Sequence, residues 1–266
     1  MVRPDRANKV CPLTRTGPCE VFIAHFKRPP YRRGHHVRIS AISFDGDMTL
    51  WDFQKVMRHS LKKALAELRR LVPTQRAVDL SVEELIAIRG EVEEAVKGRI
   101  WNHEEIRRLS FERTLEIIGR PDREIAAYLN RVYLKHRFED IELYPDVIPT
   151  FDELAPHYKL GLLSNGNSYP ERCGLEARFA FVIFSQDVQI EKPDRRIFEI
   201  AAQQADCALD ELLHVGDSLK NDVAGANAAG ARSVWLNRDR QPSHTGIVAE
   251  FEIATLADLP AVLKND

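Results

Sequence analysis

The amino-acid sequence predicts an α/β fold in which a doubly wound parallel sheet is interrupted by a long helical segment. Short apolar runs that are typical of strands alternate with helical runs, an order that favours parallel strands joined by right-handed crossovers. Several of these runs end in loops of Asp, Ser, Asn and Gly, at the edge where open α/β sheets bind their ligands. The length of 266 residues suits one core with an inserted subdomain.

The first predicted strand, residues 37–44, leads directly into the segment Asp45-Gly-Asp47-Met-Thr49. Two carboxylates thus emerge where a strand ends, so that one could attack a substrate while the other handles a proton. The alternative for such a pair is a turn or a helix N-cap, in which the aspartates bind backbone N–H groups. The pair gains weight only if other strand ends supply matching groups.

Two further segments supply such groups. A predicted strand over residues 159–163 is followed by Ser164 and Asn165, whose hydroxyl and backbone donors suit an anion. Lys192 directly precedes a predicted helix over residues 193–201. A cation at the positive end of a helix is unfavourable unless an anion or a carboxylate cluster lies there. An ordinary polar turn and a solvated lysine are the alternatives.

The fourth segment follows a predicted strand over residues 212–215 and contains Gly-Asp217-Ser and then Asp222. Asp217 leaves its strand much as Asp45 does. A helix of small residues comes next and ends at Gly230, a residue type that suits a C-cap. The alternative is that Asp217 only caps this helix.

These four segments, in this order, resemble the motifs of the haloacid dehalogenase superfamily, in particular its phosphoglycolate phosphatase-like branch. The resemblance covers residue 37 to the C-terminus and implies a Rossmann-like core with an inserted α-helical cap. The implied organisation has a core at 37–51 and 141–266 and a cap at 52–140, preceded by a separate segment at 1–36.

The resemblance also implies a role for each motif residue. Asp45 resembles the nucleophile and Asp47 the general acid and base, with Lys192 as the third catalytic residue. Phosphate binding is implied for Ser164, Asn165 and Lys192. Metal binding is implied for Asp45, the Asp47 carbonyl and Asp217. Thr49 and Asp222 are implied to support the site.

The gathered acids themselves call for a cation. A carboxylate that attacks a phosphate dianion faces like-charge repulsion, and neighbouring acids raise one another's pKa unless a cation neutralises them. Oxygen donors, with no His or Cys close by, favour Mg²⁺ over Zn²⁺. The expected activity is a Mg²⁺-dependent phosphatase that hydrolyses a small phosphomonoester through an aspartyl-phosphate on Asp45.

Three alternatives stay open. A phosphomutase shares the first half-reaction but passes the phosphoryl group to a second substrate hydroxyl. A 2-haloacid dehalogenase is disfavoured by Asp47, because the resemblance implies that dehalogenases lack an acid there. A catalytically silent binding protein is disfavoured because every motif acid and Lys192 are present. Phosphoglycolate, sugar phosphates and nucleoside monophosphates all remain candidate substrates. Met48, where most relatives have glycine, is expected to narrow the site.

The segment between about residues 52 and 140 is predicted to be helical. Leucines at helical spacing begin with Leu61 and Leu65, Ser81 and Glu84 form a capping-box pattern, and Asn102 is placed to open another helix. A lid of this kind excludes water and selects the substrate. Several residues of this segment or next to it are candidates for substrate contact. The alternative for the arginines is a solvated helix face, and for the others it is packing. The candidates are Arg99, Arg107, Arg108, Arg113, Trp51, Phe53, Trp101 and His103.

The composition argues against other classes of partner. The formal net charge of −2 gives no polyanion-binding signature, so nucleic acid is not expected. No run approaches the roughly 20 apolar residues of a membrane span, and no signal peptide is recognised. A cytoplasmic protein of undetermined oligomeric state is expected, with scattered, reduced thiols at Cys11, Cys19, Cys173 and Cys207.

Residues 1–36 are basic and rich in proline. A disordered extension or an overlong start assignment is favoured there over a tail that contacts an anionic partner or a targeting segment.

Overall fold

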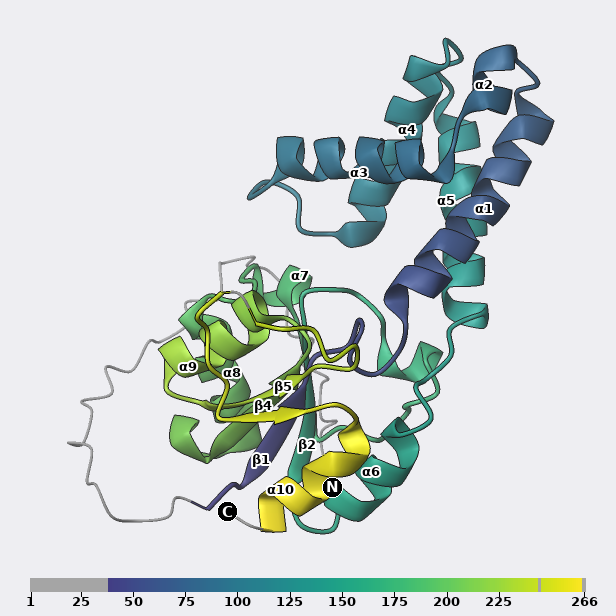
Figure 1. The fold of residues 1–266 in the computed structure, drawn as a ribbon. Coiled ribbons are helices and arrows are strands. Elements are labelled where there is room, and N and C mark those ends of the chain that lie inside the picture. Colours follow the sequence, from purple (N-terminus) through teal and green to yellow (C-terminus); the bar gives the residue numbers. More distant parts are fainter. Residues whose placement is uncertain (1–37, 244, 265–266) are drawn as a thin grey trace, which may run out of the picture. The chain divides into compact units, whose positions relative to one another are not determined.

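The computed structural model describes residues 38–243 and 245–264. The expectation for residues 1–36 therefore lies outside the described residues. The strands form one parallel sheet in the order β3-β2-β1-β4-β5-β6 (Figure 1). They are β1 (Ala41–Phe44), β2 (Lys159–Ser164), β3 (Phe181–Phe184), β4 (Leu212–Gly216), β5 (Arg232–Leu236) and β6 (Phe251–Ile253).

The strand order confirms the predicted doubly wound sheet. The chain runs outward from β1 to β3 on one side and then from β4 to β6 on the other, so the order reverses between β1 and β4. Phe44 of β1 pairs with Leu162 of β2 and with Val215 of β4. Because these strands are parallel, the polar residues that follow them leave the sheet at one edge, next to the reversal point.

Helices cover both faces of the sheet. Apolar side chains of α6 and α10, such as Phe151 and Leu259, pack with Ile42 on one face. On the other face Phe198 of α8 packs with Leu163. Figure 1 shows these two helix pairs, α6 with α10 and α8 with α9, on opposite sides of the strands. These helices and α7 are α6 (Val147–Leu154), α7 (Ser185–Val188), α8 (Arg195–Ala205), α9 (Ala224–Ala229) and α10 (Leu259–Lys264).

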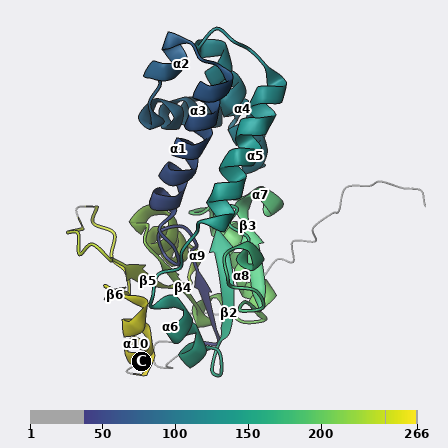
Figure 2. The same ribbon diagram turned by 90° about the vertical axis from the view of Figure 1, so that its right-hand side faces the viewer.

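The segment between β1 and α6 is helical, as predicted. Its apolar side chains, including the predicted Leu61 and Leu65, form a core of their own. The capping box of Ser81 and Glu84 is present, and α1 and α5 run side by side (Figures 1 and 2). The helices are α1 (Phe53–Leu71), α2 (Gln75–Asp79), α3 (Val82–Val96), α4 (His103–Ile117) and α5 (Arg123–Glu139).

The helix that follows the third motif begins later than predicted. The helix expected from residue 193 begins at Arg195, with Asp194 as its N-cap, and the Lys192–Pro193 peptide bond is cis. A π-helical turn, Leu219–Val223, precedes the predicted helix of small residues, which is α9 and begins at Ala224. Gly230 has a φ of 93° and is the predicted C-cap. Among the described residues, no helix combines the length and the apolar character needed to cross a bilayer.

Candidate active site

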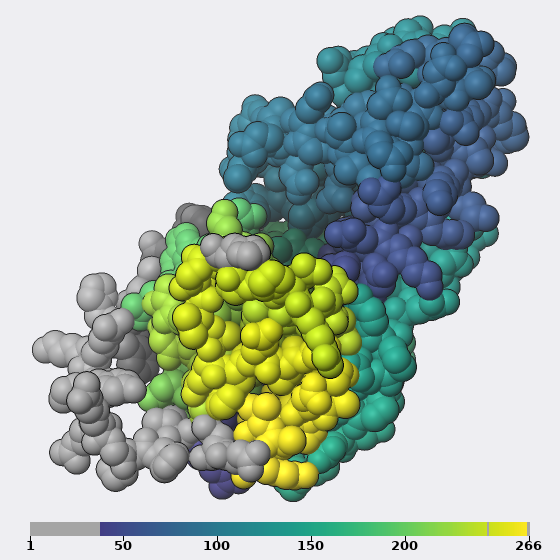
Figure 3. Space-filling model, in the orientation of Figure 1, coloured from purple at the N-terminus to yellow at the C-terminus, as the bar shows by residue number. Residues whose placement is uncertain are grey.

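A cavity of about 320 Å³ opens at the edge of the sheet where the motif loops meet. Side chains of α3, α4 and α5 line it from the other side, and Figure 3 shows a recess between the blue surface of the inserted helices and the green surface of the core. The structure thus brings together residues from all four motifs. Those that line the cavity are Asp45, Asp47, Ser164, Asn165, Lys192, Asp217 and Asp222.

Lys192 is a buried cation between two acids. Its Nζ lies 2.6 Å from Asp45 Oδ1 and 2.7 Å from Asp222 Oδ1, and it donates a third bond to the Leu163 carbonyl at 2.8 Å. Burial alone would lower the pKa of Lys192, but Asp222 and Asp45 together raise it above its ordinary value. The amine is therefore charged at neutral pH. Asp45 and Asp222 are the carboxylates that compensate this cation at the N-terminal end of α8.

Asp222 is bound on both of its oxygens. Oδ2 accepts the Ser218 backbone N–H at 2.9 Å, while Oδ1, besides contacting Lys192, lies 3.1 Å from His214 Nε2. Although burial opposes it, Lys192 lowers the pKa of Asp222. These contacts favour support of Lys192 as the role of Asp222.

Sequence reasoning missed His214. The ring is fully buried, and its Nδ1 lies 2.8 Å from the Ser43 hydroxyl. A histidine inside an apolar strand was the available signal. The expectation that no His lies near the acids is therefore wrong, although the ring contacts Asp222 rather than the other carboxylates.

The Asp47 carboxylate is held by one oxygen. Oδ1 accepts hydrogen bonds from Trp51 Nε1 at 2.7 Å and from the Ser168 hydroxyl at 3.2 Å. Arg137 donates to Ser168 at 2.6 Å and lies 3.9 Å from the same Asp47 oxygen. Trp51 is fully buried, so it positions Asp47 instead of lining the cavity mouth. Ser168 and Arg137 carried no motif signal.

Ser164 and Asn165 differ in what they offer a ligand. The Ser164 hydroxyl accepts the Gly166 N–H at 3.0 Å, and within the described part of the chain its own proton is not donated to any group. Both atoms of the Asn165 amide are bonded to the Lys192 backbone, at 2.8 and 2.9 Å. The Asn165 side chain therefore holds the Lys192 loop, and the expected phosphate contact of this residue stays a prediction for its backbone N–H.

Thr49 and Met48 lie off the cavity. Thr49 is fully buried, its hydroxyl finds no partner among the residues described, and its carbonyl accepts a bond from Arg238 at 2.9 Å. Met48 has a φ of 67°, a left-handed conformation that glycine adopts more readily. Neither side chain lines the cavity, so the expectation that Met48 narrows the site is wrong.

The acids at the sheet edge fit a hard divalent cation. Carboxylate oxygens of Asp45, Asp217 and Asp222 lie within 4.8 Å of one another. Burial raises the pKa of Asp45 well above its ordinary range. Lys192 opposes this shift, whereas Asp222 and Asp217 raise the pKa further. Burial, and after it Asp222, raises the pKa of Asp217 to about 6. Negative charge is thus in excess there, and oxygen donors are the ligands that Mg²⁺ prefers.

The four arginines weighed for substrate contact fall into two groups. Arg99, Arg108 and Arg113 lie at the surface, where Arg108 and Arg113 form ion pairs with glutamates of their own helix. Arg107 is buried and lines the cavity. The solvated-face alternative thus holds for three of them and not for Arg107.

The aromatic candidates are divided as well. Phe53 and His103 line the cavity, whereas Trp101 does not. His103 Nε2 lies 2.8 Å from the Asn165 carbonyl, so this ring joins α4 to the loop after β2. Burial lowers the pKa of His103 below its ordinary value.

Comparison with known proteins agrees with this geometry. The family model of the haloacid dehalogenase-like hydrolases matches residues 39–230. Glyceraldehyde 3-phosphate phosphatase of Methanopyrus kandleri is 32% identical over 238 residues, which are 85% of this chain and 98% of that protein. The Escherichia coli 5-amino-6-(5-phospho-D-ribitylamino)uracil phosphatase YigB is 29% identical over 235 residues, 85% of this chain and 97% of that protein.

Solved structures give the same family. A 2-haloacid dehalogenase from Pseudomonas syringae pv. Tomato DC3000 has a TM-score of 0.73 and 30% identity, with 85% of this chain and 99% of that chain covered. The chain therefore belongs to the haloacid dehalogenase-like hydrolases. It is an enzyme, and its curated relatives class it with the phosphoric monoester hydrolases of that family.

Proposed function

We propose that the protein is a Mg²⁺-dependent phosphatase that hydrolyses a small phosphomonoester through a phosphorylated Asp45. The observation that carries the proposal is the pair of carboxylates at one cavity wall with different surroundings. Asp45 is paired with Lys192 at 2.6 Å. Asp47 instead accepts hydrogen bonds from the neutral donors of Trp51 and Ser168, and its nearest cation, Arg137, is 3.9 Å away. Two carboxylates in unlike environments suit two different roles.

Asp45 is the nucleophile in this proposal. Its Oδ1 is bound to Lys192, which leaves Oδ2 to attack the phosphorus atom. The new bond joins Asp45 Oδ2 to phosphorus, and the bond that breaks joins phosphorus to the ester oxygen, which leaves with the electron pair. Lys192 and the Ser164 hydroxyl are placed to bind the phosphoryl oxygens.

Asp47 moves the protons. Because Trp51 and Ser168 both donate to Oδ1, Oδ2 is the oxygen that carries a proton. It protonates the leaving oxygen in the first step. In the second step it takes a proton from the water that attacks phosphorus, and Asp45 is released as a carboxylate together with inorganic phosphate.

The carboxylates of Asp45 and Asp217 would hold the metal, together with the Asp47 carbonyl that the family resemblance implies. Mg²⁺ bound there would neutralise charge on the phosphate and on the acids. Asp222 supports this group by fixing Lys192. The proposal further holds that the enzyme is cytoplasmic and acts on a small metabolite, and not on nucleic acid or a membrane.

The inserted helices serve as a cap in this proposal, with the boundaries 52–140. Support comes from the side chains of α3, α4 and α5 that line the cavity, and from the core that these helices form by themselves. Such a cap would exclude water during the first step and would contact the organic part of the substrate.

A second candidate function is hydrolysis of a 2-haloacid, favoured by the similarity to the Pseudomonas syringae enzyme. Phosphate release from a panel of phosphomonoesters with Mg²⁺, and halide release from 2-chloropropionate with EDTA, separate the two. We expect metal-dependent phosphate release and no halide. Halide release without phosphate release would favour the dehalogenase, and isomerisation of a sugar phosphate without phosphate release would favour a phosphomutase.

Gly166→Ala is expected to lower kcat about 10- to 100-fold, the cost of misplacing a reacting group by about 1 Å. A Cβ at Gly166 would lie 2.7 Å from Asp47 Oδ2, closer than real Cβ contacts, so the carboxylate must move. The control is Gly90→Ala in α3, where a Cβ meets nothing within 4 Å. Steady-state phosphate release measures both variants, and an unchanged kcat for Gly166→Ala would mean that Asp47 Oδ2 transfers no proton.

Asp217→Asn is expected to stabilise the metal-free protein at pH 7. The Asp217 pKa is raised from 3.8 to about 6, so between these values the folded state binds more protons than the unfolded state and stability falls as pH rises. Asparagine does not titrate. In EDTA the free energy of unfolding of the variant should exceed that of the parent by about 1 to 3 kcal/mol at pH 7. Near pH 4 the difference should be small.

Saturating Mg²⁺ should make the parent the more stable of the two proteins, because only the parent keeps the Asp217 carboxylate that would bind the metal. Denaturant unfolding at both pH values, with EDTA and with Mg²⁺, measures the effect. If the parent gains no stability from Mg²⁺ relative to Asp217→Asn, then Asp217 does not bind the metal.

A further inference from the structure

Arg107 is a buried guanidinium that forms no ion pair with a carboxylate of the described chain. The residue is only 3% exposed, and Nε and Nη1 have no hydrogen-bond partner among the described groups. Its guanidinium carbon lies 4.4 Å from the centre of the Tyr133 ring, so the face of the guanidinium packs on this ring. The N–H donors lie at the edge of the guanidinium, where they can bind an acceptor. Buried polar groups are normally hydrogen-bonded, so donors left without a partner point to a missing ligand.

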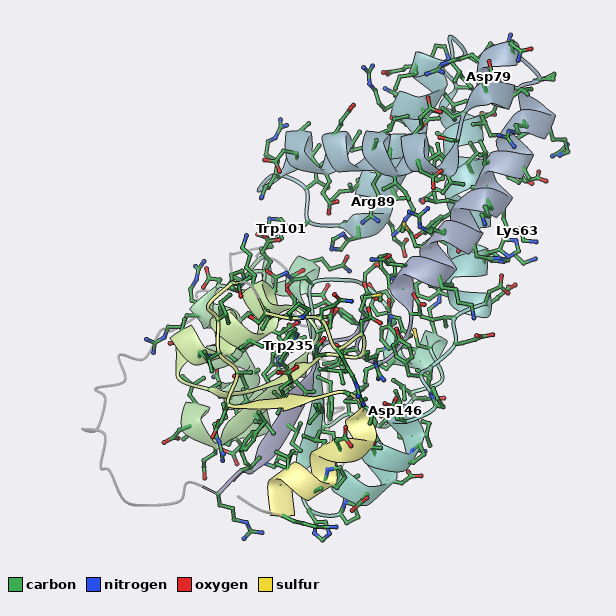
Figure 4. The ribbon with its side chains drawn as sticks, in the orientation of Figure 1. Lys63, Asp79, Arg89, Trp101, Asp146 and Trp235 are labelled. Carbon is green, nitrogen blue, oxygen red and sulfur yellow. The ribbon has the colours of Figure 1, made fainter. Side chains whose placement is uncertain are left out.

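Two further arginines line the same cavity. Arg89 projects from α3 on the side that faces the core (Figure 4), its Nε has no partner in the structure as described, and its nearest acid, Glu93, is 3.9 Å away. Arg137 is 1% exposed and uses only Nη2, so its Nε and Nη1 also find no partner in the described segments. Three arginines that each have at least one donor without a partner in the described chain thus line one cavity.

These arginines repel one another. Burial, with smaller contributions from Arg89 and Arg137, lowers the pKa of Arg107 to about 10, and the group stays charged at neutral pH. On the same helix, Arg108 and Arg113 each have a glutamate partner. The cavity is thus mainly acidic on the core side, where Lys192 also lines it, and mainly basic on the helical side, where Glu93 also lines it. A buried charge without a counterion is costly.

We propose that Arg107, together with Arg89 and Arg137, binds a second anionic group of the substrate while the phosphate to be cleaved lies at Asp45. This inference rests on the proposed phosphatase function. A guanidinium edge suits the two oxygens of a carboxylate or of a second phosphate. The substrate class is thus a small phosphomonoester with a further acidic group, which fits a cavity of about 320 Å³.

Matched pairs of substrates test the proposal. 3-Phosphoglycerate and glycerol 3-phosphate differ in a carboxylate, while ribulose 1,5-bisphosphate and ribulose 5-phosphate differ in a second phosphate. We expect kcat/KM to favour the more anionic member of at least one pair, and which pair shows it identifies the anion. Arg107→Met should lower that preference ratio about 10- to 100-fold, the contribution of hydrogen bonds to a charged group.

Arg113→Met is the matched control. It removes the same side chain from the same helix, where Arg113 is exposed and paired with Glu116, and it should leave the ratio unchanged. Arg89→Gln gives a second test that does not depend on replacing a buried residue, and it should lower the ratio as well. Circular dichroism and the Tm establish that each variant is folded.

Binding without turnover separates this inference from the proposed function. In an Asp45→Asn background, calorimetry should show that 3-phosphoglycerate or ribulose 1,5-bisphosphate binds more tightly than its less anionic partner, and that Arg107→Met abolishes the difference. Equal binding and equal kcat/KM within both pairs would overturn the inference and indicate that water satisfies these donors. Absence of phosphate release from every substrate, with the binding preference intact, would overturn only the phosphatase function.

Discussion

Replacing Asp45 by asparagine is expected to reduce kcat for phosphate release about 10⁴- to 10⁶-fold, the range seen when a covalent nucleophile is removed. An amide is a poor nucleophile toward phosphorus, and the substitution preserves the size of the side chain. Because burial and two acidic neighbours already raise the Asp45 pKa, a neutral group should not destabilise the metal-free fold. The measurement is phosphate release with saturating Mg²⁺.

Asp79→Asn is the control for this prediction. Asp79 is an exposed aspartate at the end of α2, does not line the cavity and lies at the end of the inserted helices remote from the sheet (Figure 4), so its substitution should leave kcat unchanged. Intact mass must show that the asparagine at position 45 has not reverted by deamidation. Retention of more than about a hundredth of the parent kcat would rule out Asp45 as the covalent nucleophile.

Lys192→Met is expected to have the largest combined effect on stability and activity. Its side chain is 2% exposed, and its loss would leave the buried Asp45 and Asp222 without their shared cation. Breaking a buried ion pair on one side costs about 3 to 5 kcal/mol. The same loss should reduce kcat/KM at least about 100-fold, because the phosphoryl oxygens lose a charged donor.

Urea unfolding in EDTA measures the stability, and phosphate release with Mg²⁺ measures the activity. Lys55→Met is the control, since Lys55 pairs with Glu142 in full contact with solvent and should matter little to either quantity. A Lys192→Met protein as stable as the Lys55→Met protein would contradict the view that this amine neutralises two buried acids.

The fold and the core of the site follow from local sequence patterns. Each motif comes directly after an apolar strand, and parallel strands bring their carboxyl ends to one edge. This is why Asp45, Ser164 and Asp217 meet although they are far apart in the chain. The strand β3 escaped prediction because four apolar residues show no clear periodicity.

The contacts that position the site could not be predicted in the same way. Ser168 and Arg137 reach Asp47 from different segments, and no spacing in the sequence reveals that approach. Arg107 left a weaker signal, because it lies four and seven residues before Phe111 and Thr114 and so shares their buried helix face. Its neighbour Arg108 points elsewhere for the same geometric reason.

The most direct test of the central claim is to trap the phosphorylated enzyme. Asp47→Asn should accumulate it with p-nitrophenyl phosphate, whose leaving group needs no acid, because hydrolysis of the intermediate still needs the base. Mass spectrometry after acid quenching should then find one phosphoryl group on the peptide that contains Asp45, and none when Asp45→Asn is added. Phosphate release without this peptide, or a phosphoryl group on another residue, would contradict the account.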